Sequence, residues 1–257
     1  MTNEQLYLVQ PVLDTFENED IKQFAIALLD NIPDYIWHVG ASSTGKYHPA
    51  YSLGEGGLMR HQIAVVRFLN FFFQLEQYNS KFTSREMDLM RVAGLVHDGM
   101  KSGTQEQYEK SKYTKFDHPV LMAKKIREYT EYLPVNELEF IADIISKHMG
   151  QWNTDRKSSL ALPKPNDKHS QLVHLADYLA SRKDLTMDFE GYAAAPTVTT
   201  FDPEYKLSFG KHNGQRLIDV YKTKPDYIAW CEENIHRPDF LQMIKSMKEY
   251  LKNKENE

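Results

Sequence analysis

Cysteine is almost absent from this sequence, because the chain of 257 residues contains only Cys231. A single cysteine excludes an intramolecular disulfide and therefore a disulfide-stabilised scaffold. The composition fits a protein that folds in a reducing compartment around a hydrophobic core. With 41% hydrophobic and 26% charged residues, the chain is long enough for one core and a small appended unit.

Long hydrophobic runs are also missing. The densest apolar stretch, residues 68–75, is interrupted by Asn70 and Gln74, whereas a membrane helix needs about 20 apolar residues. Residues 1–11 contain no basic segment followed by an apolar one, so no secretory signal is visible. The sequence thus predicts a cytoplasmic protein without a membrane partner.

An excess of positive charge is missing as well, since the formal net charge is −5. Such a chain has no global attraction to nucleic acid or to an anionic membrane. A local basic patch stays open as an alternative. Nothing in the sequence indicates an oligomeric state.

Helical patterns dominate the chain up to about residue 182, and no internal repeat occurs. Asn18 and the acidic residues after it predict a helix to about residue 31, and apolar periodicity predicts the others. The other expected helices cover residues 58–78, 84–97, 119–131, 135–147 and 167–182, with polar loops at 39–57, 99–115 and 150–166. We therefore expect an all-α helical bundle over residues 1–195.

The pattern changes beyond Gly191. The Ala/Thr-rich stretch 193–200 predicts an extended connector. Asn213-Gly214 then predicts a hairpin with a type I′ turn, because both residue types tolerate positive φ. Two helices should follow, over residues 225–234 and 238–252. We therefore expect a small α+β module at residues 203–257.

Histidine and aspartate stand at several helical positions where a plain pattern would put an apolar residue. A lone histidine there is more often an ordinary core residue, so the interpretation depends on the whole set. A buried carboxylate needs a partner, and a metal is one of the few adequate ones. Imidazole and carboxylate together suit Mn, Fe, Zn or Co, and helix bundles build such sites from facing helices. The candidate ligands are His61, His97, Asp98, His118, His148 and Asp177.

The order of these residues resembles the H…HD…D signature of the HD superfamily. Gly56-Gly-Leu-Met-Arg-His61 is similar to the GGLxxH element of HD-domain exoribonucleases, and His97-Asp-Gly-Met-Lys101 is similar to the HDIGK motif. His118-Pro119 and the later His148 resemble the two-metal branch. The chain contains no GYP sequence, so the resemblance does not support cyclic-di-GMP hydrolysis. It covers about residues 55–183.

The resemblance implies a role for each ligand and a helical HD-domain fold. One metal would be held by His61, His97, Asp98 and Asp177, and Asp98 would bridge to a second metal held by His118 and His148. The implied cofactor is a divalent transition metal, as two ions of Mn²⁺ or Fe, with Zn, Ni or Co as alternatives. A hydroxide on the metal would attack phosphorus.

Lys101 follows the ligands on a polar loop, and with Asp98 it is the second residue that we expect to be catalytic. It is also the expected phosphate contact, with a solvated loop lysine as the alternative. Arg60 and His174 are further candidate substrate contacts. Arg60 precedes His61 in the sequence, and His174, three residues before Asp177, can share a helix face with it. For His174, an ordinary core position stays open.

Aromatic and cationic residues near the proposed ligands extend this list. Tyr47, Tyr51, Trp152 and Tyr178 could stack on a base, although ordinary packing is the more frequent reason for such residues. Arg182 could contact phosphate, or it could be a cation at the end of its helix.

Residues 207–230 resemble the FGKxxG…PxYxxW module found at the C-terminus of exonuclease X-like proteins and in many phage-encoded proteins. The resemblance implies an accessory domain connected with nucleic-acid metabolism. Lys211 and Arg216 are its expected phosphate contacts. The alternative is a packing module without a binding role.

The combined features predict a phosphohydrolase or phosphodiesterase that acts on nucleotides or single-stranded nucleic acid. Within enzymes, the alternative is a nucleotidase or a dinucleoside polyphosphate hydrolase. A nucleotide-sensing HD protein without turnover and a two-iron HD oxygenase also stay open. The intact ligand set argues against a degenerate sensor.

Overall fold

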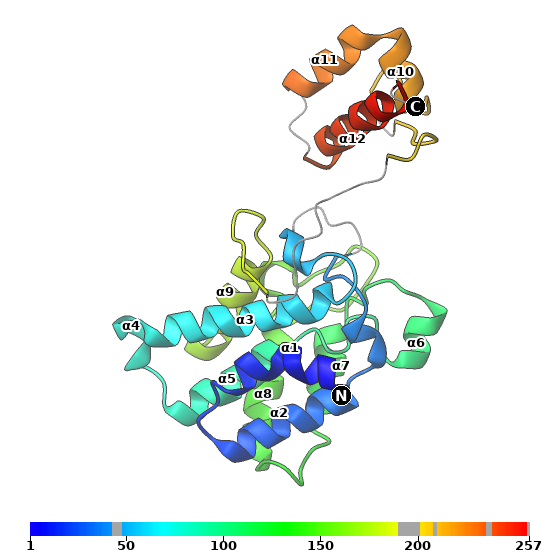
Figure 1. Ribbon diagram of the computed structural model, residues 1–257. Helices are drawn as coiled ribbons and strands as arrows, with labels where there is room; N and C mark the ends of the chain where they lie inside the picture. The colour runs from blue at the N-terminus through cyan, green and yellow to red at the C-terminus, as the bar shows by residue number, and fades with distance from the viewer. Residues whose placement is uncertain (43–47, 190–200, 208–209, 235–237, 256–257) are drawn as a thin grey trace. The chain divides into compact units, whose positions relative to one another are not determined.

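The computed structural model describes residues 1–42, 48–189, 201–207, 210–234 and 238–255. The chain divides into two compact units, residues 1–189 and 190–257 (Figure 1). The sequence placed the end of the first domain at residue 195. The extended connector predicted at 193–200 lies outside the described residues.

The regular secondary structure described for the N-terminal unit is helical, with polar loops between helices and an isolated bridge between Thr154 and Ala161. This confirms the predicted helical character of the unit. Three 3-10 turns, η1 (Asp34–Trp37), η2 (Ala50–Ser52) and η3 (Gly150–Trp152), connect the helices. The α-helices are α1 (Asn3–Leu13), α2 (Glu19–Asn31), α3 (Gly57–Gln74), α4 (Glu76–Asn79), α5 (Ser84–Val96), α6 (Gln105–Lys110), α7 (His118–Ile126), α8 (Val135–Lys147) and α9 (Lys168–Ala180).

Side-chain caps explain where several of these helices begin. Thr2, Thr83 and Thr104 each form a capping box with a Gln or Glu three residues later. The boxes at Thr2 and Thr104 start α1 and α6, two helices that the apolar periodicity did not predict. Pro11 lies inside α1, and α6 has six residues, so neither gives a strong periodic pattern.

Two helices are shorter than predicted. α3 ends at Gln74, because Leu75 is extended with ψ 131°, and the short α4 follows it. α7 ends at Ile126, and turn bonds such as Tyr129 N–H to Ile126 O (3.2 Å) replace the helix. The turn buries Tyr129, whose ring lies 5.7 Å from that of Phe24. Burial of this ring therefore competes with continuation of the helix.

The core of the N-terminal unit is built around α3. This helix packs against α5 and α9, while α5 also packs against α2 and α8, and α7 lies against α8 (Figure 1). Ile63, Val66 and Leu69 are fully buried on α3, and burial of each such side chain contributes about 1.5–3 kcal/mol. This packing brings side chains from α3, α5, α7, α8 and α9 toward one region.

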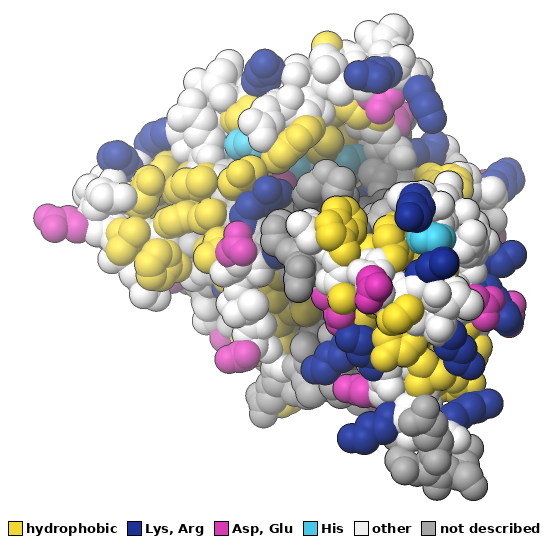
Figure 2. Space-filling model, turned by 90° about the horizontal axis from the view of Figure 1, so that it is seen from above, with side chains coloured by type: hydrophobic (Ala, Val, Ile, Leu, Met, Phe, Trp, Pro, Cys, Tyr) yellow, Lys and Arg dark blue, Asp and Glu magenta, His cyan; other side chains and the backbone are white. Residues whose placement is uncertain are grey.

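The face shown in Figure 2 carries acidic, basic and hydrophobic side chains, and no single sign of charge covers it. This agrees with the modest net charge of −5. Among the helices that the structure describes, none combines the length and the hydropathy that a membrane crossing requires.

The C-terminal unit contains α10 (Leu217–Thr223), α11 (Pro225–Asn234) and α12 (Pro238–Glu255). The structure confirms the two helices predicted at 225–234 and 238–252, and α10 is an additional one. These helices surround a small core that includes Leu217, Ile228, Cys231, Phe240 and Ile244.

The predicted α+β character of this unit is not seen in the residues described. Their only β-type pairing is an isolated bridge between Lys206 and Arg216. The predicted type I′ turn is wrong, because Gly214 has φ +82° whereas Asn213 does not take positive φ. The backbone closes a longer loop instead: Gly214 N–H donates to Leu207 O (2.7 Å), so Asn213-Gly214 is not a two-residue turn.

Candidate metal centre

Five helices of the N-terminal unit bring the predicted ligands together. His97 caps the C-terminal end of α5 and Asp98 follows it, while His148 caps the C-terminal end of α8. The other three ligands are His61 on α3, His118 at the first position of α7 and Asp177 on α9. All are buried except Asp177, whose side chain is 20% exposed.

Local structure before α3 positions His61. Gly56 has φ +68°, and a Cβ atom on Gly57 would lie 2.4 Å from the carbonyl oxygen of Ser52. Only glycine permits this close approach, so the Gly-Gly pair lets η2 fold against the start of α3. Arg60 then donates to the carbonyl oxygens of Tyr51 (2.5 Å) and Glu55 (2.8 Å). The buried guanidinium therefore holds this loop.

One cluster of ligand atoms consists of His61, His97 and Asp177. Asp177 Oδ1 lies 3.0 Å from His61 Nε2 and 3.5 Å from His97 Nε2. One ligand atom from each residue falls within 4.8 Å of the other two. These distances place the three donors around a common point.

A second cluster is centred on Asp98. Its Oδ1 lies 2.9 Å from His118 Nε2 and 3.7 Å from His148 Nε2, while its Oδ2 lies 3.7 Å from His97 Nε2. His97, Asp98 and His148 again offer atoms within 4.8 Å of one another. His97 belongs to both clusters and therefore connects them, and Asp98 lies beside it.

Backbone carbonyls fix the orientation of three of the imidazoles. Nδ1 of His97, His118 and His148 lies 2.9, 2.6 and 2.8 Å from the carbonyl oxygens of the residues three positions earlier, Gly94, Lys115 and Ile145. A carbonyl only accepts, so Nδ1 carries the hydrogen and Nε2 keeps its lone pair. Each Nε2 then faces the clusters as a ligand atom.

The charges in the site favour ionised carboxylates. Burial alone would lower the pKa of His97, but Asp98 and Asp177 raise it above its ordinary value. Burial alone would raise the pKa of the Asp98 carboxyl, but Lys101, His97 and His118 together hold it well below its ordinary value. The pKa of Asp177 is also held well below its ordinary value, since His97 and His61 outweigh its burial. Burial lowers the pKa of His148 to about 3.

These donors fit a bound cation. Nε2 of His118 and Nε2 of His148 lie 3.2 Å apart, and with both Nδ1 atoms protonated two lone pairs face each other. A cation near these nitrogens and the Asp98 carboxylate would relieve the repulsion, and imidazole with carboxylate suits Mn, Fe, Zn or Co.

A pocket of about 530 Å³ opens onto these ligands. Lys101 lies in it, with Nζ 2.5 Å from Asp98 Oδ2. The other residues of its lining are His48, His61, Asp98, Thr114, His118, His148, Met149, Trp152, Asp177, Ser181 and Arg182. Arg60 and His174 do not line it. His174 Nδ1 lies 2.7 Å from the carbonyl oxygen of His148 and thereby supports the end of α8.

His48 is a pocket residue that the sequence did not predict. Its ring lies 5.5 Å from that of His61, and its Nδ1 is buried without a hydrogen-bond partner in the described part of the chain. Burial lowers the pKa of His48 to about 4, so it is neutral at neutral pH. It lies in a loop without periodicity, where spacing gives no signal.

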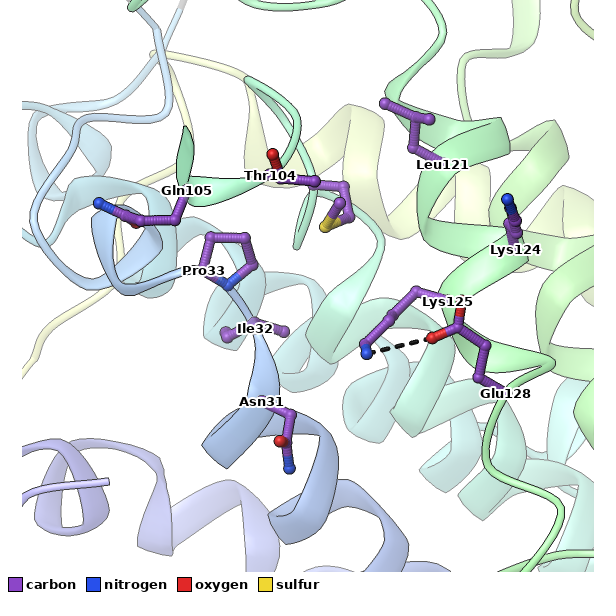
Figure 3. A pocket seen from close by; sticks show the side chains of 10 residues that line it. Asn31, Ile32, Pro33, Thr104, Gln105, Leu121, Lys124, Lys125 and Glu128 are labelled. Atoms are coloured by element: carbon purple, nitrogen blue, oxygen red, sulfur yellow. Dashed lines mark hydrogen bonds and ion pairs between the residues drawn. The ribbon is translucent and has the colours of Figure 1, made fainter. Parts of the chain in front are cut away.

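A second pocket, of about 460 Å³, lies beside the segment after Asp98 (Figure 3). Met100 and Thr104 from this segment and Leu121 from α7 line it. Lys125 in its wall pairs with Glu128 at 3.2 Å, as the dashed line in Figure 3 shows. Its lining contains no histidine or aspartate, so the ligand clusters belong to the first pocket alone among those described.

The two predicted phosphate contacts of the C-terminal unit differ in their pairing. Arg216 pairs with Glu204 and with Asp219, both at 2.7 Å. Lys211 is exposed. Lys211 is thus the more available of the two cations.

Two family models match the chain. Residues 59–182 match the HD domain, and residues 207–236 match the exodeoxyribonuclease X-like C-terminal domain. No curated protein and no solved structure matches significantly. The first match includes all six candidate ligands, and the second covers α10 and α11.

Proposed function

This chain belongs to the HD-domain family through residues 59–182, and from that premise we propose that it hydrolyses phosphate esters of nucleotides or single-stranded nucleic acid. HD-domain proteins are in general metal-dependent hydrolases. The observation that carries the proposal is the convergence of six buried or half-buried His and Asp side chains: five line one pocket, and His97 lies beside Asp98 and Asp177. Asp98 is the centre of one of the two clusters that they form, and it approaches His97, which belongs to both.

The proposed ligands divide between two sites. His61, His97 and Asp177 would hold one ion, and His118 with His148 would hold the other, with Asp98 shared. Mn²⁺ or Fe is the proposed metal, with Zn or Co as alternatives, because mixed imidazole and carboxylate ligands suit all of these ions. When bound, such ions supply Lewis-acid chemistry for phosphate-ester hydrolysis.

The chain's own residues would prepare the site in three ways. The carbonyl partners of three Nδ1 atoms keep each Nε2 directed at the clusters, so little reorganisation accompanies metal binding. Lys101 places an ammonium group in the pocket beside Asp98, where an anionic phosphate would bind. Arg60 keeps the loop before α3 closed, and this in turn keeps His61 in place.

The C-terminal unit supports a nucleic-acid substrate. Residues 207–236 match the exodeoxyribonuclease X-like C-terminal domain, which by its description occurs in an enzyme that acts on DNA. We propose that Lys211 and, to a smaller extent, Arg216 contact the phosphate backbone. Arg216 would contribute less because Glu204 and Asp219 already neutralise it.

Metal analysis combined with a hydrolysis panel tests this function. Purified full-length protein is loaded with Mn²⁺ and assayed on mononucleotides, cyclic dinucleotides, dinucleoside polyphosphates, and short RNA and DNA. We expect hydrolysis of at least one class, and loss of it in Asp98→Asn and after chelation. Metal uptake without hydrolysis of any class would point to a sensor. Activity that survives both chelation and Asp98→Asn would refute the proposed mechanism.

A further inference from the structure

Trp152 exposes a large aromatic ring at the pocket that holds the candidate ligands. It is 46% exposed, whereas Trp37 in the same unit is 8% exposed. Trp152 ends η3, four residues after the ligand His148, and it lines the same pocket as Asp177 and Lys101. An exposed tryptophan beside a reactive centre offers a flat apolar surface to a ligand.

Tyr178 and the turn at Gly150 hold the Trp152 ring in place. Trp152 stacks on Tyr178, the neighbour of Asp177, with ring centroids 6.0 Å apart and planes at 16°. Gly150 has φ +54°, and a Cβ atom there would lie 2.2 Å from the His174 ring, so the turn that presents Trp152 requires glycine. Directly after the ring, Asn153 exchanges two hydrogen bonds with Leu162 (2.8 and 2.9 Å). The aromatic surface is therefore pre-organised.

The other aromatic candidates have structural roles. Tyr51 is 3% exposed and donates to the carbonyl oxygen of Ala180 at 2.9 Å. Tyr178 supports Trp152. Tyr47 lies outside the described residues. Trp152 is thus the aromatic side chain, among those described, that lines the pocket with an exposed ring.

A cation accompanies this surface. Arg182 places its guanidinium carbon 4.4 Å from the centre of the Tyr178 ring and lines the same pocket. One terminal nitrogen donates to Ser181 Oγ at 3.1 Å. Its Nε is buried and has no hydrogen-bond partner within the described residues. An unsatisfied buried donor of a charged group is costly, and an anionic oxygen would satisfy it.

From these observations we infer that Trp152 is the base-stacking platform of the pocket and that Arg182 binds a phosphate of the same ligand. The ligand class is a nucleoside phosphate, and this assignment rests on the proposed function because it names the substrate of that site. A volume of about 530 Å³ lies in the range of pockets, about 300–1,000 Å³, that enclose drug-sized ligands. A phosphate ester without a base would use Arg182 and leave Trp152 uncovered.

Binding of two phosphonates tests the inference. They are the non-hydrolysable phosphonate analogues of AMP and of ribose 5-phosphate, titrated calorimetrically into the Mn²⁺-loaded full chain. Stacking on an aromatic side chain contributes about 1–3 kcal/mol per base, so Trp152→Ala should weaken the AMP analogue about 5- to 150-fold. The affinity of Trp152→Ala for the ribose analogue should change less than about twofold. Trp152→Phe should retain most of the wild-type affinity for the AMP analogue. Arg182→Met should weaken both analogues by a similar factor, about tenfold or more.

Trp230 provides a matched control. It is 51% exposed and stacks on Tyr227, with centroids 6.2 Å apart and planes at 20°, but it belongs to the C-terminal unit. Trp230→Ala should leave both affinities unchanged. Equal losses for both analogues in Trp152→Ala, or no loss for either, would overturn the inference.

The metal content of every variant separates this inference from the proposed function. Wild-type protein that binds metal and hydrolyses a phosphate ester, but shows no preference for the AMP analogue, overturns only the base-stacking platform. If the protein takes up no metal but binds the AMP analogue in a manner that requires Trp152, the proposed function is overturned. The inference that Trp152 stacks on the base is then retained.

Discussion

Replacement of Asp98 by asparagine should abolish most of the stabilisation that metal gives this protein. Asp98 approaches three imidazoles, at 2.9 Å from His118, 3.7 Å from His148 and 3.7 Å from His97, which belongs to both clusters. Asparagine keeps the size of the side chain and removes its charge. The variant therefore loses a ligand shared by both proposed ions.

The expected magnitude follows from linkage between binding and folding. At a free Mn²⁺ concentration of about 100 times Kd, binding stabilises the folded state by about 2.7 kcal/mol. For a unit of about 150–250 residues, each kcal/mol raises Tm by about 2–4 °C. Wild-type protein should therefore gain about 5–11 °C on addition of Mn²⁺, and Asp98→Asn less than about a third of that.

The assay is thermal unfolding of each variant with and without Mn²⁺, together with metal analysis. Each variant is compared with its own metal-free state, so a change in intrinsic stability cancels. Asp143→Asn is the matched control, because Asp143 is 52% exposed on α8 and pairs only with Lys147 in the contacts described. A full wild-type gain in Asp98→Asn would refute the shared-ligand role of Asp98.

Three further predictions follow from the structure. His118→Ala and His148→Ala should each lower the Mn²⁺ content from two ions toward one without unfolding the protein; retention of two ions would rule out the second site. Burial alone would raise the pKa of Asp167, but hydrogen bonds from Ser170 and Lys147 lower it below its ordinary value of 3.8. The ionised Asp167 therefore stabilises the folded state above pH 3.8, and this stabilisation is lost as the pH falls below that value. Asp167→Ala should cost about 1 kcal/mol of unfolding free energy at pH 7, and urea denaturation should show a smaller difference near pH 3; an equal loss at both pH values would contradict the pKa argument. A chain ending at residue 200 should retain its metal content and lose mainly the hydrolysis of longer nucleic acids, with the difference shrinking as salt rises; an empty metal site would show that the C-terminal unit belongs to the catalytic core.

Local signals in the sequence determined much of the helical structure. Caps and apolar periodicity act over a few residues, so the predictions for α2, α5, α8 and α9 agree with the structure within two residues at each end. The boxes at Thr2 and Thr104 were equally local signals and would have revealed α1 and α6. The Asn213-Gly214 dipeptide predicted the wrong turn. The hydrogen bond from Gly214 N–H to Leu207 O closes a longer loop, and a dipeptide does not encode that longer-range contact.

The sequence also singled out the six candidate ligands, because polar residues at apolar helical positions stand out and their order resembles a known signature. It could not assign their contacts. Packing among α3, α5, α7, α8 and α9 decides that Asp98 approaches His118, His148 and His97, and that Arg60 faces the loop at Tyr51 and not the pocket. His48, Trp152 and Arg182 join the same pocket from distant segments. Sequence periodicity encodes which face of a helix is buried, whereas only the tertiary structure decides which buried faces meet, because this depends on side-chain volumes and loop closures across the whole unit.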